Sequence, residues 1–269
     1  MRKPFGALGL AALAVVALAP TVLGATTRVV VTPTNLQGWV VDTTVLGNQS
    51  VPYNFNGPAD SDGGNGSFQF GPIAGLGAAK QEMQPPDVNF DVTTFDALSF
   101  EYQILAPASV GSTSDQVYVN VYVDSAANGL GFYGSGLSST GFYDCRYTFV
   151  ADTANPGWNT LSFSDATSPD SLASRHTSCA ATIGGNTGNI QFVRLNGGDT
   201  STNDNNMRAA YDLVEIAIGG NTTLYDFEPY AVATSKDQCK DGGWQTVNRA
   251  NGSSFKNQGD CIQYVNTGK

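Results

Sequence analysis

Stretches in which apolar and polar residues alternate one by one recur along most of this chain. In Gln116–Asp124 a valine stands at every second position from Val117 to Val123, and Ala97–Ile104 alternates in the same way. Because successive side chains of a strand point to opposite faces, this period of two predicts strands with one face against a core. Further strands are predicted at Arg28–Thr32, Gly38–Asp42, Ser67–Phe70, Phe142–Val150, Trp158–Phe163, Asn189–Leu195, Ala209–Ile218 and Thr223–Phe227.

The number and spacing of these strands favour a β-sandwich. Ten to twelve short strands joined by turns rich in Gly, Asn and Pro are typical of two sheets packed face to face. Only four Glu and six Lys occur in the chain, and no segment has the pattern of an amphipathic helix. We predict an all-β fold, a sandwich with jelly-roll connectivity.

The N-terminus reads as an export signal. Two basic residues, Arg2 and Lys3, precede an apolar run from Phe5 to Ala19, and small residues follow at Gly24 and Ala25. The run is about 15 residues long, shorter than the roughly 20 that span a bilayer as a helix. We expect residues 1–24 to be a cleaved signal peptide, with an uncleaved anchor as the alternative. No second long apolar run follows, so no membrane span is expected after cleavage.

The charge of the chain argues against nucleic acid as a partner. The formal net charge is −10, and loss of Arg2 and Lys3 with the signal lowers Lys+Arg from 13 to 11 against 23 acidic residues, which gives about −12. An acidic surface repels phosphate backbones. We expect a secreted or cell-surface protein that does not bind nucleic acid.

Four cysteines in an exported chain indicate two disulfides. Three pairings are formally possible. Locality in the sequence favours Cys145–Cys179 and Cys239–Cys261, each contributing about 3 kcal/mol by restricting the unfolded chain. Zinc is disfavoured because the chain has no CxxC spacing and a single histidine, His176.

A change in composition after Pro229 separates a tail from the sandwich. We expect the sandwich at residues 25–229, and a linker with a small cysteine-bracketed module at residues 230–269. The tail, Cys239–Trp244 followed by Phe255–Cys261, resembles a module of the form CKxGGW…FKNQGxC found at the C-terminus of many secreted bacterial proteins.

The body resembles secreted bacterial β-sandwich proteins of uncharacterised function. The resemblance rests on Phe142–Arg146, Cys179, Leu195–Thr202, Tyr211–Val214 and Leu224–Pro229. It implies a jelly-roll-like fold and an extracellular location, and it supplies no activity.

One strand face has the composition of a sugar-binding platform. Tyr118, Asn120 and Tyr122 share a face of Gln116–Asp124, and aromatic rings can stack on pyranose faces while amides bind hydroxyls. Phe132, Tyr133 and Tyr143 are further candidates. The alternative is an ordinary strand, in which alternating tyrosines reflect β-propensity alone.

Calcium is the metal that the loops favour. Asp199, Asn203 and Asp204 lie in one oxygen-rich loop, and Asp60–Asn65 forms another. Hard cations take ligands of this kind, although turns are also rich in them. We expect no cofactor, with a structural calcium ion as the one candidate and Asp199, Asn203 and Asp204 as its candidate ligands.

Catalytic motifs are absent from the sequence. No GxSxG elbow accompanies His176, so serine-hydrolase chemistry is disfavoured. Glu101 and Glu215 lie in predicted strands, and Glu82 lies near one. A pair of them could act on a glycosidic bond. Glu101 could instead simply face solvent, or pair with Arg194 or Arg146. The sequence favours a non-enzymatic module that recognises an extracellular ligand, carbohydrate or another cell-surface component. The alternatives are a glycan-active enzyme and a structural envelope protein.

Overall fold

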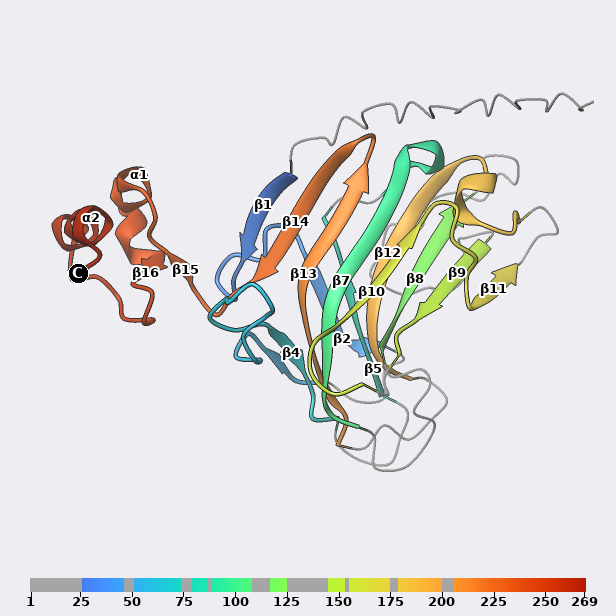
Figure 1. The fold of residues 1–269 in the computed structure, drawn as a ribbon, viewed down its shortest axis with the longest axis horizontal. Coiled ribbons are helices and arrows are strands. Elements are labelled where there is room, and N and C mark those ends of the chain that lie inside the picture. Colours follow the sequence, from blue (N-terminus) through green and yellow to red (C-terminus); the bar gives the residue numbers. More distant parts are fainter. Residues whose placement is uncertain are drawn as a thin grey trace, which may run out of the picture.

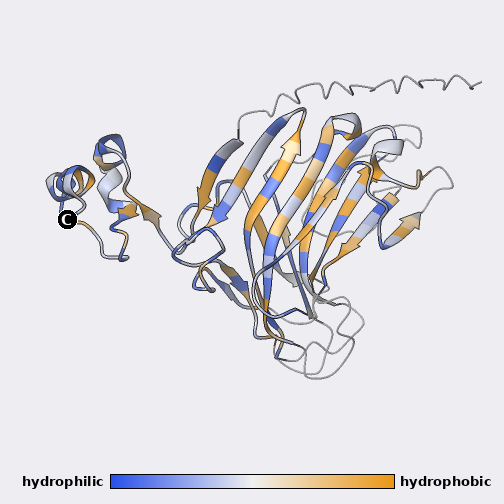
Figure 2. Ribbon diagram, in the orientation of Figure 1, coloured by the Kyte–Doolittle hydropathy of each residue, from blue (hydrophilic) through white to orange (hydrophobic). Residues whose placement is uncertain are grey.

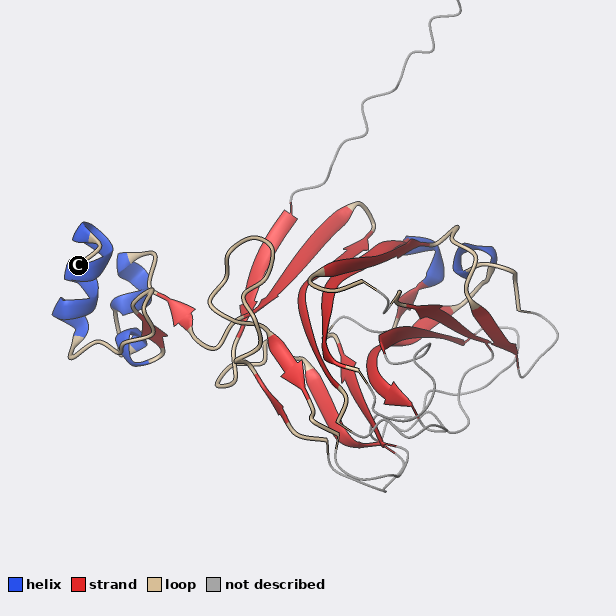
Figure 3. Cartoon of the chain, turned by 60° about the horizontal axis from the view of Figure 1, so that its bottom comes forward, coloured by secondary structure: helices blue, strands red, loops and turns tan. Residues whose placement is uncertain are grey.

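The computed structural model describes residues 26–45, 51–73, 79–86, 89–107, 117–124, 145–152, 155–174, 179–199 and 206–269. The expected signal peptide lies outside these residues. Most of the described chain is strand, and the long strands form two seven-stranded sheets that curl and face one another (Figures 1 and 3). The predicted all-β sandwich with a disulfide-stapled C-terminal appendage is confirmed.

The first sheet is built around β13, Arg208–Ile218. This strand pairs with β14 (Asn221–Phe227) along its second half, with β4 (Phe68–Phe70) along its first half, and with β7 (Phe95–Ala106) on the opposite side. The sheet is completed by β10 (Asn159–Ser164) beside β7, β3 (Tyr53–Asn54) beside β4, and β1 (Thr26–Val31) beside β14. The β1–β14 pair is parallel, whereas the other pairs of this sheet are antiparallel.

The second sheet is antiparallel throughout its described pairs. Its strands run in the order β11 (Ser171–Ser174), β9 (Cys145–Val150), β8 (Val117–Asp124), β12 (Asn189–Asp199), β5 (Ala79–Gln84) and β2 (Val40–Val45). A two-residue strand, β6 (Phe90–Asp91), pairs with the start of β12. Short 3-10 helices follow at Val92–Thr94 and Ile183–Gly185.

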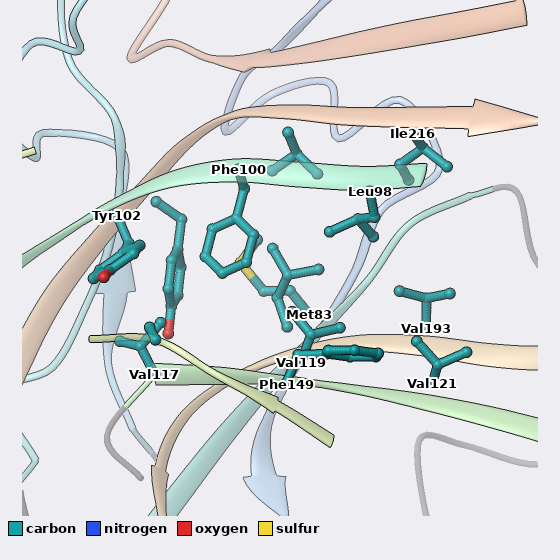
Figure 4. Packing of buried hydrophobic residues seen from close by; sticks show 14 of the residues in the cluster. Met83, Leu98, Phe100, Tyr102, Val117, Val119, Val121, Phe149, Val193 and Ile216 are labelled. Carbon is teal, nitrogen blue, oxygen red and sulfur yellow. The ribbon is translucent and has the colours of Figure 1, made fainter. Parts of the chain in front are cut away.

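The core lies between the two sheets. Figure 4 shows Leu98, Phe100 and Ile216 of the first sheet facing Val119 and Met83 of the second. Alternate residues along the long strands are apolar and face inward, which Figure 2 shows as alternating orange and blue segments. The predicted inward face of β8 is therefore confirmed, because its four valines are fully buried in this core.

A separate small core forms in the C-terminal tail. Its buried residues are Ala233, Cys239, Val247, Phe255 and Cys261. The tail contains β15 (Ala231–Val232), α1 (Lys236–Cys239), a 3-10 turn at Gly243–Gln245, β16 (Val247–Asn248) and α2 (Gln258–Thr267). Cys239 is joined to Cys261 in this core, and Cys145 to Cys179 in the sandwich, so the expected disulfide pairing is confirmed.

Helix α2 forms although no segment of the sequence has the pattern of an amphipathic helix. Its apolar residues are few, and the sequence therefore has no strong period of 3.6. Its ends are nevertheless marked: the Asn257 side chain accepts a hydrogen bond from the Asp260 N–H, and Gly268 closes the helix with a φ of 70°. An Asn cap and a terminal Gly were the signals that could have located it. No helix among the described residues is long and apolar enough to cross a bilayer.

Candidate functional site

The outer face of the second sheet carries the residues predicted to bind a ligand. Tyr118, Asn120 and Tyr122 point away from the core valines of β8. In the sheet register Asn120 lies opposite Arg194 of β12, and Asn196 of β12 lies between Tyr118 and Glu82. Aromatic, amide and charged side chains from three neighbouring strands therefore share one surface.

This surface is not the solvated face that the alternation suggested. Tyr118 is 9% exposed, Asn120 3% and Tyr122 1%. The same burial extends to Arg194 and Glu82, each 0% exposed. The three β8 residues thus belong to an enclosed polar layer and do not form an open platform, and their role in ligand binding stays a prediction.

A buried ion pair organises the layer. Arg194 Nη1 lies 2.7 Å from Glu82 Oε2, and Lys80 Nζ lies 2.6 Å from Glu82 Oε1. Burial lowers the pKa of Lys80, and the Glu82 carboxylate opposes that shift. One carboxylate thus holds two cations, and buried charges are tolerated in proteins when they are paired in this way.

The aromatic rings of the layer pack against these cations. The Arg194 guanidinium carbon lies 4.8 Å from the centroid of the Phe192 ring and 5.3 Å from that of Tyr122. Lys80 Nζ lies 5.3 Å from the Tyr118 centroid. Cation–π contacts of this length add to the attraction in a desolvated site.

Amide and hydroxyl groups extend the layer toward β9. Asn120 accepts a hydrogen bond from the Thr148 hydroxyl at 2.8 Å, and its amide donates to the Tyr122 hydroxyl at 3.2 Å. Some buried atoms of the layer have no hydrogen-bond partner among the described residues: Gln84 Oε1, Arg146 Nε and Asn196 Oδ1. A buried polar atom without a partner carries a desolvation cost, which a ligand with hydroxyl groups could relieve.

Sequence reasoning did not identify Lys80, Glu82 and Arg194 as parts of one site. Strand β5, Ala-Lys-Gln-Glu-Met-Gln, has few β-branched or aromatic residues and was not predicted as a strand. The structure pairs Arg194 with Glu82, so the suggested partnership of Arg194 with Glu101 is wrong. Lys80, Gln81 and Glu82 are consecutive, polar and all buried, so β5 lacks the alternation of apolar and polar residues by which the other strands were predicted.

The two glutamates considered for catalysis line one shallow hollow on the outer face of the first sheet. The hollow measures about 250 Å³ and is lined by Glu101, Glu215, Ser99, Thr160 and residues of neighbouring strands. Glu101 accepts hydrogen bonds from the Ser61 N–H and hydroxyl, and Glu215 accepts a long one, 3.4 Å, from Ser99. Glu82 belongs to the other sheet.

The remaining predicted residues lie at or beyond the limits of the described chain. Asp199 is the last residue of β12, whereas Asn203 and Asp204 lie outside the described residues, so the calcium site predicted there is untested. His176, Phe132, Tyr133 and Tyr143 also lie outside them.

No family model matches the sequence, and no curated protein matches it. Among solved structures, the arabinose-bound α-L-arabinofuranosidase MgGH51 is similar over 70% of this chain and 24% of its own, with 9% identity and a TM-score of 0.39. The family 11 carbohydrate-binding module of the cellulase Lic26A-Cel5E of Clostridium thermocellum is similar over 67% of this chain and 88% of its own, with 10% identity and a TM-score of 0.39. Tailspike protein 4 of bacteriophage CBA120 is similar over 68% of this chain and 20% of its own, with 11% identity and a TM-score of 0.37. Sequence identities and TM-scores this low do not allow a function to be transferred to this chain.

Proposed function

We propose that this protein is an exported, non-enzymatic recognition module that binds carbohydrate at the polar layer of its second sheet. The observation that supports the proposal is the convergence of tyrosines, amides and paired charges on one sheet face. Pyranose rings present apolar CH faces and many hydroxyl groups, and sites of mixed aromatic and polar lining suit both.

The layer offers both kinds of contact in a small area. Tyr118, the most exposed of the three β8 residues at 9%, supplies ring surface, while Asn196 supplies an amide oxygen. The unpartnered Asn196 Oδ1 and Gln84 Oε1 can accept hydrogen bonds from hydroxyl groups, and Arg146 Nε can donate one. A sugar bound there would be enclosed, so its affinity would depend on a few well-directed hydrogen bonds more than on stacking area.

The test is a glycan array followed by calorimetry on the sugars that bind. We expect Tyr118→Phe, which removes one hydroxyl, to weaken binding about tenfold, the loss of roughly 1.4 kcal/mol that a single hydrogen bond gives. Asn120→Ala should weaken it further because the Tyr122 hydroxyl loses its donor as well.

A matched control comes from the opposite sheet. Tyr53 is 40% exposed on β3, and Tyr53→Phe should leave binding unchanged. If no glycan binds, or if Tyr118→Phe and Tyr53→Phe bind equally well, the carbohydrate proposal is wrong.

Export is part of the proposal and has separate support. Two disulfides lie in the described chain, and such bonds persist in oxidising compartments. The basic and apolar start of the sequence fits a signal peptide. Mass spectrometry of protein recovered from the culture medium should find a mature chain that begins at Ala25. Retention of an intact Met1 in the cell would contradict the export proposal.

A second candidate function rests on the hollow that Glu101 and Glu215 share. Glycoside hydrolysis uses two carboxyl groups on either side of the scissile bond, and these are two glutamates on one surface. Glu215 is exposed, however, and the hollow that it shares with Glu101 measures only about 250 Å³. Polysaccharide hydrolysis that disappears in both Glu101→Gln and Glu215→Gln would favour this function over recognition.

A further inference from the structure

Three buried aspartates meet where β13, β14 and the loop before β4 come together. Asp60 lies in that loop, Asp212 in β13 and Asp226 in β14, and they are 7%, 0% and 2% exposed. One carboxylate oxygen from each lies within 4.8 Å of the others. In Figure 1 this region is at the arrowheads of β1 and β14, next to the loop that leads into β4.

Each carboxylate is held through one of its two oxygens. Asp212 Oδ1 accepts the N–H groups of Leu213 at 2.7 Å and Phe227 at 2.8 Å. The register of β13 against β7 shifts between Asp212 and Glu215, and Leu213 has a φ of 45°. A bulge of this kind re-aims side chains, here turning Asp212 toward β14.

The other two aspartates are fixed in a comparable way. Asp60 Oδ1 accepts the N–H groups of Asp62 at 3.1 Å and Gly64 at 2.8 Å. Asp226 Oδ2 accepts from Arg28 Nε at 3.0 Å. All three side chains are therefore rigidly placed, and each has one oxygen that these donors do not use.

Those second oxygens are buried and have no partner among the described residues. They are Asp60 Oδ2, Asp212 Oδ2 and Asp226 Oδ1. Leaving one buried polar atom unsatisfied costs about 1–3 kcal/mol, and more when the group is charged. Three such atoms on three adjacent carboxylates indicate a ligand that accepts electron pairs from oxygen.

Among the described residues, the cluster has more negative than positive charge around it. Glu228 and Asp62 lie beside it, and Arg28, which contacts Asp62 and Asp226, is the cation in contact with it. Burial raises the pKa of Asp212 to about 9, of Glu228 to about 7, and of Asp60 to about 6. The carboxylates are therefore poorly stabilised as anions by the protein alone.

We propose that Asp60, Asp212 and Asp226 bind a divalent cation, Ca²⁺, through their unpartnered oxygens. Two oxygens bound to one Ca²⁺ are at most about 5 Å apart, because each lies roughly 2.4 Å from the ion. One carboxylate oxygen of each aspartate lies within 4.8 Å of the others, which is close enough for one ion. Carboxylate oxygens are the ligands that Ca²⁺ prefers. Asp60 comes from the Asp60–Asn65 loop, the other oxygen-rich loop in the sequence, whereas Asp212 and Asp226 were not among the predicted ligands and Asp199 is not part of this site.

Gly64 supports the proposal because the loop must pass close to the carboxylates. A Cβ at position 64 would lie 2.5 Å from Glu228 Oε1 and 3.0 Å from Asp60 Oδ2. The residue therefore leaves just enough room for the Asp60 and Glu228 side chains. The bound ion would connect the loop before β4 to β13 and β14 and so stabilise this end of the first sheet.

The first experiment is thermal unfolding of the full chain after treatment with EDTA and dialysis, with Ca²⁺ added back. We expect Ca²⁺ to raise the Tm in a saturable way with one ion bound per chain. Asp212→Asn keeps an oxygen for the Leu213 and Phe227 N–H groups but loses the charge, and its Ca²⁺ affinity should fall at least about tenfold. Glu215→Gln, three residues along the same strand and exposed, should respond like the wild type.

The second experiment uses Tb³⁺ as a luminescent substitute for Ca²⁺. The Trp158 indole N–H donates to the carbonyl of Ala59, the neighbour of Asp60, at 2.7 Å. Excitation of tryptophan should therefore sensitise bound Tb³⁺, and Ca²⁺ should displace it. Trp158→Phe should reduce the luminescence without changing the Ca²⁺-dependent rise in Tm.

The outcomes that overturn the proposal are distinct. They are a wild-type Tm that does not respond to Ca²⁺, a response to Mg²⁺ alone, or an Asp212→Asn variant that binds Ca²⁺ as tightly as the wild type. If Asp212→Asn does not fold, Asp226→Asn and the wild-type Tb³⁺ titration decide the question. Sugar binding is not a readout here, so a failure of this proposal leaves the carbohydrate proposal intact.

Discussion

The two sheets of the sandwich each bury a group of ionisable side chains, and the two groups are built differently. On the second sheet, Glu82 lies between two cations, Arg194 and Lys80. On the first sheet, Asp60, Asp212 and Asp226 lie together, and Arg28 contacts only the last of the three. The group on the second sheet holds its one carboxylate between two cations, whereas the group on the first sheet has an excess of negative charge.

The difference shows how buried charge can report on function. In a group of opposite charges that contact one another, removing the one carboxylate leaves the cations uncompensated. A group with an excess of negative charge is relieved by losing a carboxylate charge or by gaining a cation. The same substitution, carboxylate to amide, should therefore have opposite signs in the two groups.

Glu82→Gln should have the largest effect. It leaves two buried cations without their shared carboxylate, and we expect a loss of about 3–5 kcal/mol in the free energy of unfolding. Urea denaturation should show this loss equally in EDTA and in Ca²⁺. Glu215→Gln, the same change at an exposed site, should shift stability by less than about 0.5 kcal/mol. Equal stability of the two variants would contradict a stabilising role for Glu82 between the two cations.

Gly64→Ala should have the next largest effect. The added methyl group would contact Glu228 and Asp60, and relieving such overpacking typically costs about 1–3 kcal/mol. The Ca²⁺-dependent rise in Tm should also become smaller because the carboxylates are pushed aside. Gly259→Ala in α2, where the nearest atom is 3.3 Å away, serves as the control and should leave the Ca²⁺ response unchanged. A full Ca²⁺ response in Gly64→Ala would mean that the loop does not help to form the site.

Asp212→Asn in EDTA should raise stability. Burial raises the pKa of Asp212 to about 9, so at pH 7 the wild type must protonate on folding a carboxyl that is ionised in the unfolded chain, and an amide avoids this cost. We expect an increase of about 1 kcal/mol or more in the free energy of unfolding by urea at pH 7, and a smaller increase at pH 5. A loss as large as that of Glu82→Gln would remove the distinction between the two groups.

The smallest effect should come from an ion pair that is partly exposed. In the C-terminal tail, Arg249 Nη2 lies 2.7 Å from Asp260 Oδ1. The Lys256 N–H and then Arg249 lower the pKa of Asp260. A lowered folded pKa adds stability that is present above the unfolded value, about 3.9, and is lost as the pH falls through the folded value.

Hydrogen exchange of the α2 amides, corrected for the intrinsic rate at each pH, measures this contribution. Protection should decline slightly between pH 5 and pH 3 in the wild type. Asp260→Asn should show lower protection at pH 5 and no further decline attributable to this group. If the variant declines as the wild type does, Asp260 does not cause the pH dependence.

The sequence predicted the strands that alternate and missed what depends on contacts between distant strands. The alternating valines of β8 identified the core-facing side of that strand, but β5 has no such pattern, so the Glu82 ion pair could not be predicted.

Part of the aspartate cluster could have been predicted, because the Gly219-Gly220 turn implies a β13–β14 hairpin that brings residues 212 and 226 near each other. The approach of Asp60 depends on packing of the loop before β4, which no local pattern specifies. Helix α2 was missed because its stability depends on caps and a disulfide, with few apolar residues of its own.

The parallel pairing of β1 with β14 has a consequence for the order in which the molecule can be assembled. Thr26–Val31 has its only described strand partner in Asn221–Phe227, nearly at the end of the sandwich. A polypeptide made from its N-terminus must therefore synthesise almost the whole sandwich before its first strand can be docked, and contacts so distant in sequence form slowly. Arg28 can contact Asp226 only after β1 has docked on β14, so β1, the first strand of the sandwich to be synthesised, is among the last to become native.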